Sequence, residues 1–237
     1  LRDVYKRQEE YDAARRSTRY AHYTSRPIIQ GMYDALKGFG FTGGKVLEPG
    51  AGVGNFMGLM PADLRTGSRM TGVERERIAA GIAKHLYPNQ NMQMQDFTEF
   101  QASDGYFGAI RLPNNAFAKN ANTEVTTDII FLQKLPEAEW GSKAAKADLK
   151  RWLDTTTIPD PAGGAPVKVN QYFADNPSMM LGEYGRFGTM YGPDQPALVA
   201  RAGQDTGALL RQAIDRLPKG VYEDAAVSYT TAVQSEN

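Results

Sequence analysis

Residues 48–56 read EPGAGVGNF and place three glycines directly after a short strand pattern, Lys45–Glu48 (KVLE). Glycines at the end of a strand let the backbone turn tightly and let a ligand approach it, because no Cβ stands in the way. A helix-like run follows, and a helix there would offer free N–H groups and the positive end of its dipole to a carboxylate or phosphate. The stretch therefore predicts a nucleoside-type cofactor site. The alternative is a tight strand-to-helix turn without a ligand.

The spacing of these glycines bears on the kind of cofactor. Dinucleotide sites use G-x-G-x-x-G, whereas Gly50, Gly52 and Gly54 are evenly spaced and Asn55 stands where the third glycine belongs. The sequence also offers no residues that could be nominated for hydride transfer. A nucleotide-dependent Rossmann oxidoreductase is therefore the weakest of the functions considered.

Two more strand patterns follow the glycine stretch, Arg69–Glu74 (RMTGVE) and Asn91–Gln95 (NMQMQ). Between them, residues 75–86 have the apolar spacing of a helix, with Ile78, Ile82 and Leu86 in one stripe. Strands and helices that alternate with short links are typical of βαβ units, which form parallel sheets. An α/β fold of the Rossmann-like kind is expected.

Acidic residues stand at the ends of the second and third strand patterns. Glu74 can accept hydrogen bonds from both hydroxyls of a ribose, and Asp96 can accept one from an adenine amino group, with Phe97 packing on the ring. An acid at a strand end is often only a turn or capping residue. The succession of three such strand ends is the stronger observation, because α/β sheets bind their ligands at the carboxyl edge.

The segments 23–36 (YTSRPIIQGMYDAL), 45–61 (KVLEPGAGVGNFMGLMP), 72–89 (GVERERIAAGIAKHLYPN) and 95–97 (QDF) resemble the methylase portion of large methylase–helicase proteins of plasmids and conjugative elements. More broadly, they resemble adenine-N6 DNA methyltransferases. The resemblance runs from about residue 16 to residue 134. It implies a Rossmann-like S-adenosylmethionine-dependent methyltransferase sheet, DNA as a partner, and a helicase region in the same larger polypeptide.

The resemblance also implies roles for individual residues. The methionine part of S-adenosylmethionine would lie against Tyr23, Thr24 and Pro27. The cofactor loop would be formed by Glu48, Gly50 and Gly52. The ribose would be held by Glu74, and the adenine by Asp96 and Phe97.

One part of the family pattern is absent from the sequence. In that family an Asn- or Asp-Pro-Pro-aromatic tetrad holds the target adenine and stacks on the flipped base. No such tetrad occurs here, and the sequence passes from DGYF directly to GAIRLPNNAF. The nearest substitutes are Asn114, Asn115 and Phe117, but without two prolines the rigid backbone of the tetrad is lost and a strand-to-strand loop is favoured. We therefore expect impaired methyl transfer to adenine, or a non-catalytic cofactor-binding or interaction fragment.

Composition limits the remaining chemistry. The 237 residues include no cysteine and only two histidines, which excludes disulfides, thiolate sites and most zinc chemistry. Basic and acidic residues number 27 each, and tight autonomous DNA binding is not expected because phosphate contacts require cations. No apolar run is long enough to span a membrane. We expect a cytoplasmic protein with neither a membrane nor a metal partner.

Three regions are expected along the chain. Residues 1–15 form an N-terminal tail, of which 1–8 resemble a translated adapter tract. Residues 16–135 form the methyltransferase-like cofactor-binding domain, with late strands at 106–110 and 128–134 on a sheet that is shortened. Residues 136–237 form a linker and an irregular C-terminal extension that contains helices, including one at 205–217.

Overall fold

The computed structural model describes residues 8, 11–12, 24–95, 104–117, 125–134, 142–161, 163–188 and 195–222. Two compact units make up the chain. The first contains residues 1–33 and 42–101, and the second contains residues 34–41 and 102–237.

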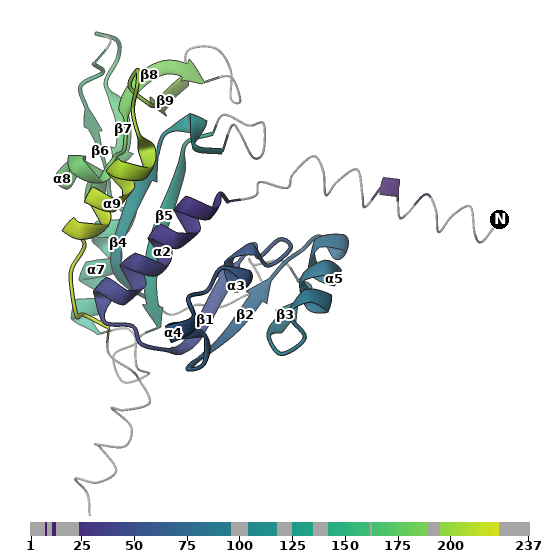
Figure 1. The fold of residues 1–237 in the computed structure, drawn as a ribbon. Helices are drawn as coiled ribbons and strands as arrows, with labels where there is room; N and C mark the ends of the chain where they lie inside the picture. Colours follow the sequence, from purple (N-terminus) through teal and green to yellow (C-terminus); the bar gives the residue numbers. More distant parts are fainter. Residues whose placement is uncertain are drawn as a thin grey trace, which may run out of the picture. The chain divides into compact units, whose positions relative to one another are not determined.

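The first unit contains a three-stranded parallel sheet in the order β1-β2-β3 (Figure 1). Its strands are β1 (Gly44–Pro49), β2 (Ser68–Val73) and β3 (Asn91–Gln93). The register places Glu48 beside Gly72 and Pro49 beside Val73, so β1 and β2 end level with each other. The segments that leave these two strands therefore start from the same carboxyl edge of the sheet, which is where α/β folds place their ligands.

Short helices link the strands. They are α3 (Asn55–Gly58) and α4 (Ala62–Arg65) between β1 and β2, and α5 (Arg77–Leu86) between β2 and β3. The carboxylate of Glu76 caps α5 by accepting a hydrogen bond of 2.8 Å from the backbone N of Ala79. This bond satisfies one of the N–H groups that a helix start leaves without an internal partner.

Helix α2 (Arg26–Phe39) precedes the sheet and is shared between the units. The carbonyl of Ser25 accepts hydrogen bonds from the backbone N of Ile28 and of Ile29, which form the first turn of the helix. In the first unit the ring of Tyr33 is fully buried and stacks on Phe56 with 4.3 Å between ring centroids.

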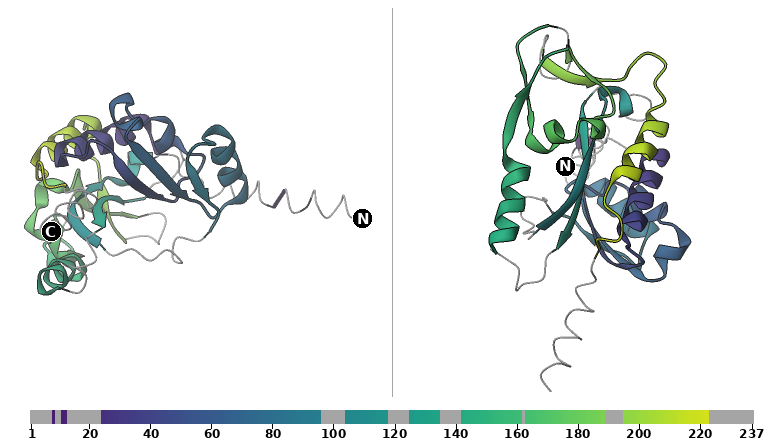
Figure 2. Two further views of the ribbon diagram at one scale, coloured as in Figure 1. Left: turned by 90° about the horizontal axis from the view of Figure 1, so that it is seen from below. Right: turned by 90° about the vertical axis from the view of Figure 1, so that its left-hand side faces the viewer.

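The second unit is built around the long antiparallel pair β4 (Asp104–Leu112) and β5 (Thr127–Lys134), which the right view of Figure 2 shows along its length in teal. The 3-10 helix η2 (Asn114–Phe117) follows β4, and α9 (Thr206–Arg216) contacts β4. The remaining elements are α7 (Lys143–Leu153), β6 (Thr155–Ile158), β7 (Val167–Asn170), α8 (Gln171–Asp175), η4 (Pro177–Met179), β8 (Glu183–Gly188) and β9 (Gln195–Val199). Antiparallel pairing joins β6 to β7 and β8 to β9.

The expected α/β class with a Rossmann-like parallel sheet is confirmed. The C-terminal part has more regular structure than the expected linker and irregular extension, because residues 155–158 and 167–170 form the antiparallel pair of β6 and β7. Val167, Val169, Tyr184 and Leu198 form a buried cluster there. The boundary expected near residue 135 lies outside the described residues and stays a prediction.

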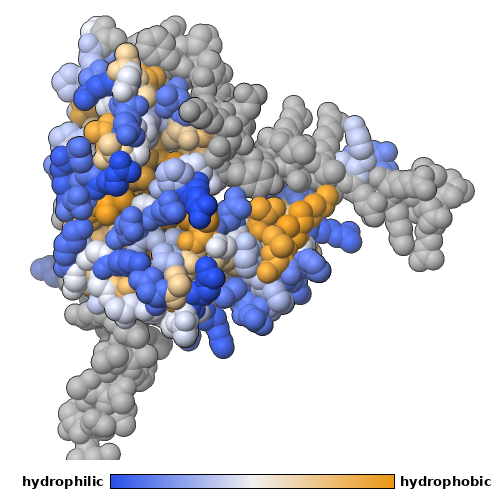
Figure 3. All heavy atoms as spheres, in the orientation of Figure 1, coloured by the Kyte–Doolittle hydropathy of each residue, from blue (hydrophilic) through white to orange (hydrophobic). Residues whose placement is uncertain are grey.

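Helix α5 packs through a different face from its apolar stripe. Its buried residues are Ala79, Ala80 and Ala83, whereas Ile82 and Leu86 are 43% and 56% exposed. Small alanines let a helix approach its neighbours closely, and a Cβ placed on Gly54 would lie 3.4 Å from the Cβ of Ala83. The helix therefore buries its alanine face, where it can approach its neighbours closely, and the larger side chains of Ile82 and Leu86 remain exposed to solvent. The surface visible in Figure 3 is mostly hydrophilic, with hydrophobic side chains gathered in a few patches.

Among the described residues, no helix has both the length and the apolar character that a membrane crossing requires.

Candidate functional site

The glycine loop, residues 50–54, is fastened to the end of β2 by its backbone. The N–H groups of Gly50 and Ala51 both donate to the carbonyl of Val73, at 2.8 and 2.9 Å. Gly50, Gly52 and Gly54 have φ values of 73°, 54° and 84°, a region that L side chains rarely adopt. The sequence needs glycine at these positions because the chain must turn sharply between β1 and α3.

The carboxylate of Glu74 holds the loop from the side. Its Oε2 accepts from the N of Gly52 at 2.8 Å, and its Oε1 accepts from the N of Glu76 at 2.6 Å. The backbone N of Glu74 in turn donates to the carbonyl of Gln93 at 2.9 Å. This one residue, predicted from the sequence as a ribose ligand, therefore connects the glycine loop to β3 and to the start of α5.

Two of the glycines leave open space in front of the backbone. A Cβ built on Gly50 or Gly52 would meet no heavy atom within 4 Å, whereas one on Gly54 would lie 2.6 Å from the ring of Tyr87. Gly54 is therefore required by internal packing. Gly50 and Gly52 present bare backbone to a molecule that approaches from outside.

A second carboxyl group, that of Glu48, lies at the end of β1. Burial, with a smaller effect from the neighbouring charge of Glu74, raises the pKa of Glu48 to about 8. Its Oε2 is buried and accepts no hydrogen bond from the described residues. An unsatisfied buried carboxyl group is costly, and a cation or a hydrogen-bond donor from a ligand would relieve that cost.

Tyr33 packs against α3, the helix that follows the loop, a role for which the sequence analysis did not single it out. Its hydroxyl donates to the carbonyl of Phe56 at 2.7 Å. Burial, followed by the nearby charge of Glu48, raises the pKa of Tyr33, so the hydroxyl stays protonated as a donor. A tyrosine on the apolar face of a helix is the only sequence signal, and it does not distinguish this role from ordinary packing.

The helix after the loop is shorter than the motif suggests. α3 contains four residues, and its N-cap residue, Gly54, has no side chain that could cap the helix. A macrodipole requires several aligned turns, and one turn provides little of it. The positive dipole end expected at the start of this helix is therefore small, and the charges near the loop come from carboxylates.

The structure brings four of the predicted site residues together at the edge of β1 and β2, namely Glu48, Gly50, Gly52 and Glu74. Thr24 and Pro27 lie at the start of α2. Tyr23, Asp96 and Phe97 lie outside the described residues.

The weak catalytic candidates form η2 in the second unit. Asn114 is 7% exposed and Phe117 is 6% exposed, whereas Asn115 is exposed. A residue that stacks on a flipped base has to present its ring to solvent before the base arrives. The burial of Phe117 thus agrees with the expectation that this segment is a strand-to-strand loop, and not a base-binding motif. Among the residues that the structure describes, no group of three or more His, Asp or Glu side chains is placed to hold a metal.

Comparison with known proteins gives partial likenesses. No known family profile matches the chain. The "Defense against restriction protein B" of Escherichia phage P1 is 30% identical over 96 residues. The match spans 40% of this chain and only 4% of the phage protein's own length.

Solved structures are similar over a comparable share of the chain. The plantazolicin methyltransferase BpumL in complex with SAH is 22% identical, covering 40% of this chain and 36% of its own, with a TM-score of 0.27. Protein-L-isoaspartate O-methyltransferase is 20% identical, covering 43% of this chain and 40% of its own, with a TM-score of 0.29.

Proposed function

We propose that the first unit binds S-adenosylmethionine and is the cofactor-binding part of a methyltransferase-like protein. The observation that carries this proposal is the carboxylate of Glu74, which accepts from the N of Gly52 at 2.8 Å beside a loop with open backbone at Gly50 and Gly52. The sequence resemblance selects this cofactor among the nucleoside-type molecules that such a loop can take.

The residues present suit the chemical parts of this cofactor. A carboxylate has about four acceptor positions, so Glu74 can accept from ribose hydroxyls while it keeps its two backbone bonds. Glu48, with its raised pKa, would ionise when the cationic methionine part binds, and its buried oxygen would then gain the partner that it lacks. When bound, S-adenosylmethionine supplies an electrophilic methyl group on its sulfonium. The roles of Tyr23, Thr24 and Pro27 at the methionine part, and of Asp96 and Phe97 at the adenine, follow from the resemblance alone.

The methyl acceptor that we propose is the exocyclic amino group of adenine in DNA, as in the adenine-N6 DNA methyltransferases that the sequence resembles. Two observations support it: the sequence resemblance to adenine-N6 DNA methyltransferases, and the similarity to a phage protein named for defence against restriction. Because the Asn/Asp-Pro-Pro-aromatic tetrad is absent from the sequence, methyl transfer by this chain is impaired.

A second candidate function is a non-catalytic cofactor-binding or interaction fragment of a larger methylase–helicase protein. The burial of Asn114 and Phe117 favours it, since it removes the nearest substitutes for the tetrad. The small share of the phage protein that the match spans also agrees with a part of a longer polypeptide.

Binding of S-adenosylmethionine should weaken at least about tenfold, or about 1.4 kcal/mol, in Glu74→Ala. The substitution removes a ribose acceptor and releases the N of Gly52, so the loop loses its shape as well as a ligand contact. Calorimetric titration of the full chain measures the effect.

Asp63→Ala is the matched control, because Asp63 is an exposed acid of the same unit, on α4. Equal affinity in Glu74→Ala and the control would remove the site assignment. Tighter binding of NADH than of S-adenosylmethionine would support the oxidoreductase alternative instead.

Transfer of a tritiated methyl group to adenine-containing DNA should not exceed the level without protein. The physical reason is the lack of an acceptor pair that would orient the lone pair of the adenine amino group towards the methyl group. Incorporation that survives both Asn114→Ala and Asn115→Ala would show that catalytic residues lie elsewhere in the chain. Incorporation that either substitution abolishes would assign the chemistry to η2.

A further inference from the structure

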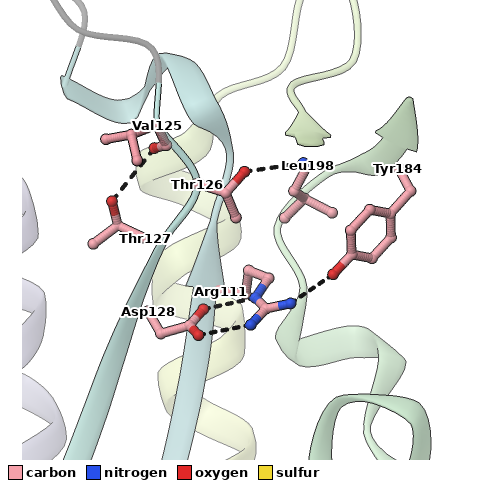
Figure 4. Close-up of polar contacts among 7 residues, drawn as sticks. All are labelled: Arg111, Val125, Thr126, Thr127, Asp128, Tyr184 and Leu198. Atoms are coloured by element: carbon pink, nitrogen blue, oxygen red, sulfur yellow. Dashed lines mark hydrogen bonds and ion pairs between the residues drawn. The ribbon is translucent and has the colours of Figure 1, made fainter. Parts of the chain in front are cut away.

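A group of polar side chains surrounds Arg111 in the second unit, remote in sequence from the glycine loop (Figure 4). The Nε and Nη2 of Arg111 each donate to one carboxylate oxygen of Asp128, both at 2.7 Å, and its Nη1 donates to the hydroxyl of Tyr184 at 2.6 Å. The ring of Phe173 covers the guanidinium at 4.4 Å from its centroid. Arg111 is thus fixed on three sides, so its geometry is set before any ligand arrives.

A hollow of about 370 Å³ opens beside this group. This volume is in the range of small-molecule sites. Its lining combines donors with apolar surface and consists of Arg111, Thr126, Val167, Lys168, Tyr184 and Pro196.

The donors at the hollow have capacity left. The hydroxyl of Tyr184 accepts from Arg111, and the hydroxyl of Thr126 accepts from the N of Leu198 at 3.0 Å, so each retains its own proton to donate. The exposed ammonium group of Lys168 takes part in no ion pair or side-chain hydrogen bond with the residues that the structure describes. Arg111 has five N–H donors, of which three are used in these bonds.

Within the described part of the chain, the charge at the hollow is positive. Asp128 is the acid that contacts this group, and Arg111 engages both of its carboxylate oxygens and offsets its charge. Lys168 then supplies an ammonium group that is not balanced by a neighbouring carboxylate in the described part of the chain. Hydroxyl and N–H donors around a cation favour an anionic group, and the side chains of Val167 and Pro196 favour an apolar body attached to it.

We propose that this hollow binds a small organic anion, in which a carboxylate or phosphate group lies against Lys168, Thr126 and Arg111 and a compact apolar body contacts Val167 and Pro196. The site belongs to the second unit, and it does not depend on S-adenosylmethionine. It provides a binding function for the C-terminal part of the chain.

Calorimetric titration of the full chain with phenyl phosphate, benzoate and benzamide at constant ionic strength tests this proposal. These probes share a ring and differ in charge, so at least one of the two anions should bind at least tenfold more tightly than neutral benzamide. The stronger anion identifies the acidic group that the site prefers. Equal affinities for all three probes, or no binding of either anion, would overturn the proposal.

Lys168→Gln should weaken binding of the preferred anion at least fivefold, because it removes the charge and keeps a side chain of similar length. Lys143→Gln, at an exposed lysine on α7 of the same unit, is the matched control and should leave the affinity unchanged. Both lysines are exposed, so neither change should impair folding. Equal losses in the two variants would show non-specific attraction to positive charge and would contradict a site at Lys168.

Discussion

Replacing Arg111 with methionine is expected to lower the free energy of unfolding of the second unit by about 3 kcal/mol. Arg111 and Asp128 lie directly opposite each other in the register of β4 and β5. Their side chains are 18% and 27% exposed, so little solvent screens the pair. Methionine keeps the apolar contacts of the chain but leaves the carboxylate of Asp128 and the hydroxyl of Tyr184 without their donor.

In the wild type Arg111 keeps its charge, so the ion pair with Asp128 is present at every pH at which Asp128 is ionised. Burial by itself would lower the pKa of Arg111, but its hydrogen bonds and attraction to Asp128 outweigh burial and raise the pKa. The guanidinium is therefore charged at every pH at which the protein folds. The bidentate geometry also cannot be reproduced by lysine, which offers a point charge without a planar pair of donors.

Tryptophan fluorescence during urea unfolding measures the prediction, because both tryptophans, at positions 140 and 152, belong to the second unit. Arg201→Met is the matched control. Arg201 contacts Glu183 at the same 2.7 Å, but the two side chains are 62% and 56% exposed. Exposed pairs contribute less than about 1 kcal/mol, so equal losses in the two variants would show that burial of the Arg111 pair has no energetic consequence.

The parallel sheet was predictable from the sequence because its signals are local. The patterns at 45–48, 69–74 and 91–95 lie within a few residues of β1, β2 and β3. Each strand is followed by a short link, and short βαβ links leave little choice of pairing. The packing of β8 and β9 is different in kind, since they are joined to the rest of the unit by hydrogen bonds to Arg111 and Thr126, more than 70 residues away in sequence.

The sequence predicts which residues gather at the candidate site, namely the glycines and Glu74, but it does not predict the hydrogen bonds between them. The sequence places Glu74 at a strand end, which suffices to predict a ligand for a ribose. The bond from the N of Gly52 to Glu74 depends on the positive φ of Gly50 and Gly52, which orients that N–H towards β2. Likewise, the need for glycine at position 54 arises from the ring of Tyr87, and such a contact leaves no local pattern.

The buried carboxyl group of Glu48 predicts a stability that falls as the pH rises. Its pKa is about 8 in the folded protein, whereas the ordinary value is 4.5. Below pH 4.5 both states hold the proton and no difference arises. Between pH 4.5 and 8 the unfolded chain releases the proton while the folded chain retains it, so unfolding becomes progressively easier, and above pH 8 the full penalty applies. At about 1.4 kcal/mol per pKa unit, the total penalty well above pH 8 approaches about 5 kcal/mol.

Glu48→Gln should remove this dependence, because glutamine resembles the protonated carboxyl group and does not titrate. At pH 8 the variant should therefore be more stable than the wild type by about 4 kcal/mol, while at pH 5 the two should differ by less than about 1 kcal/mol. Amide hydrogen exchange of β1 and β2 measures the stability of the first unit directly. The control Asp63→Asn, at an exposed acid, should follow the wild-type profile.

A bound sulfonium would favour ionised Glu48, so wild-type affinity for S-adenosylmethionine should rise between pH 6 and 8 and that of Glu48→Gln should not. Wild-type stability that does not change between pH 5 and 8 would mean that the carboxyl group of Glu48 is ionised throughout, and the predicted rise in affinity for S-adenosylmethionine between pH 6 and 8 would then not occur.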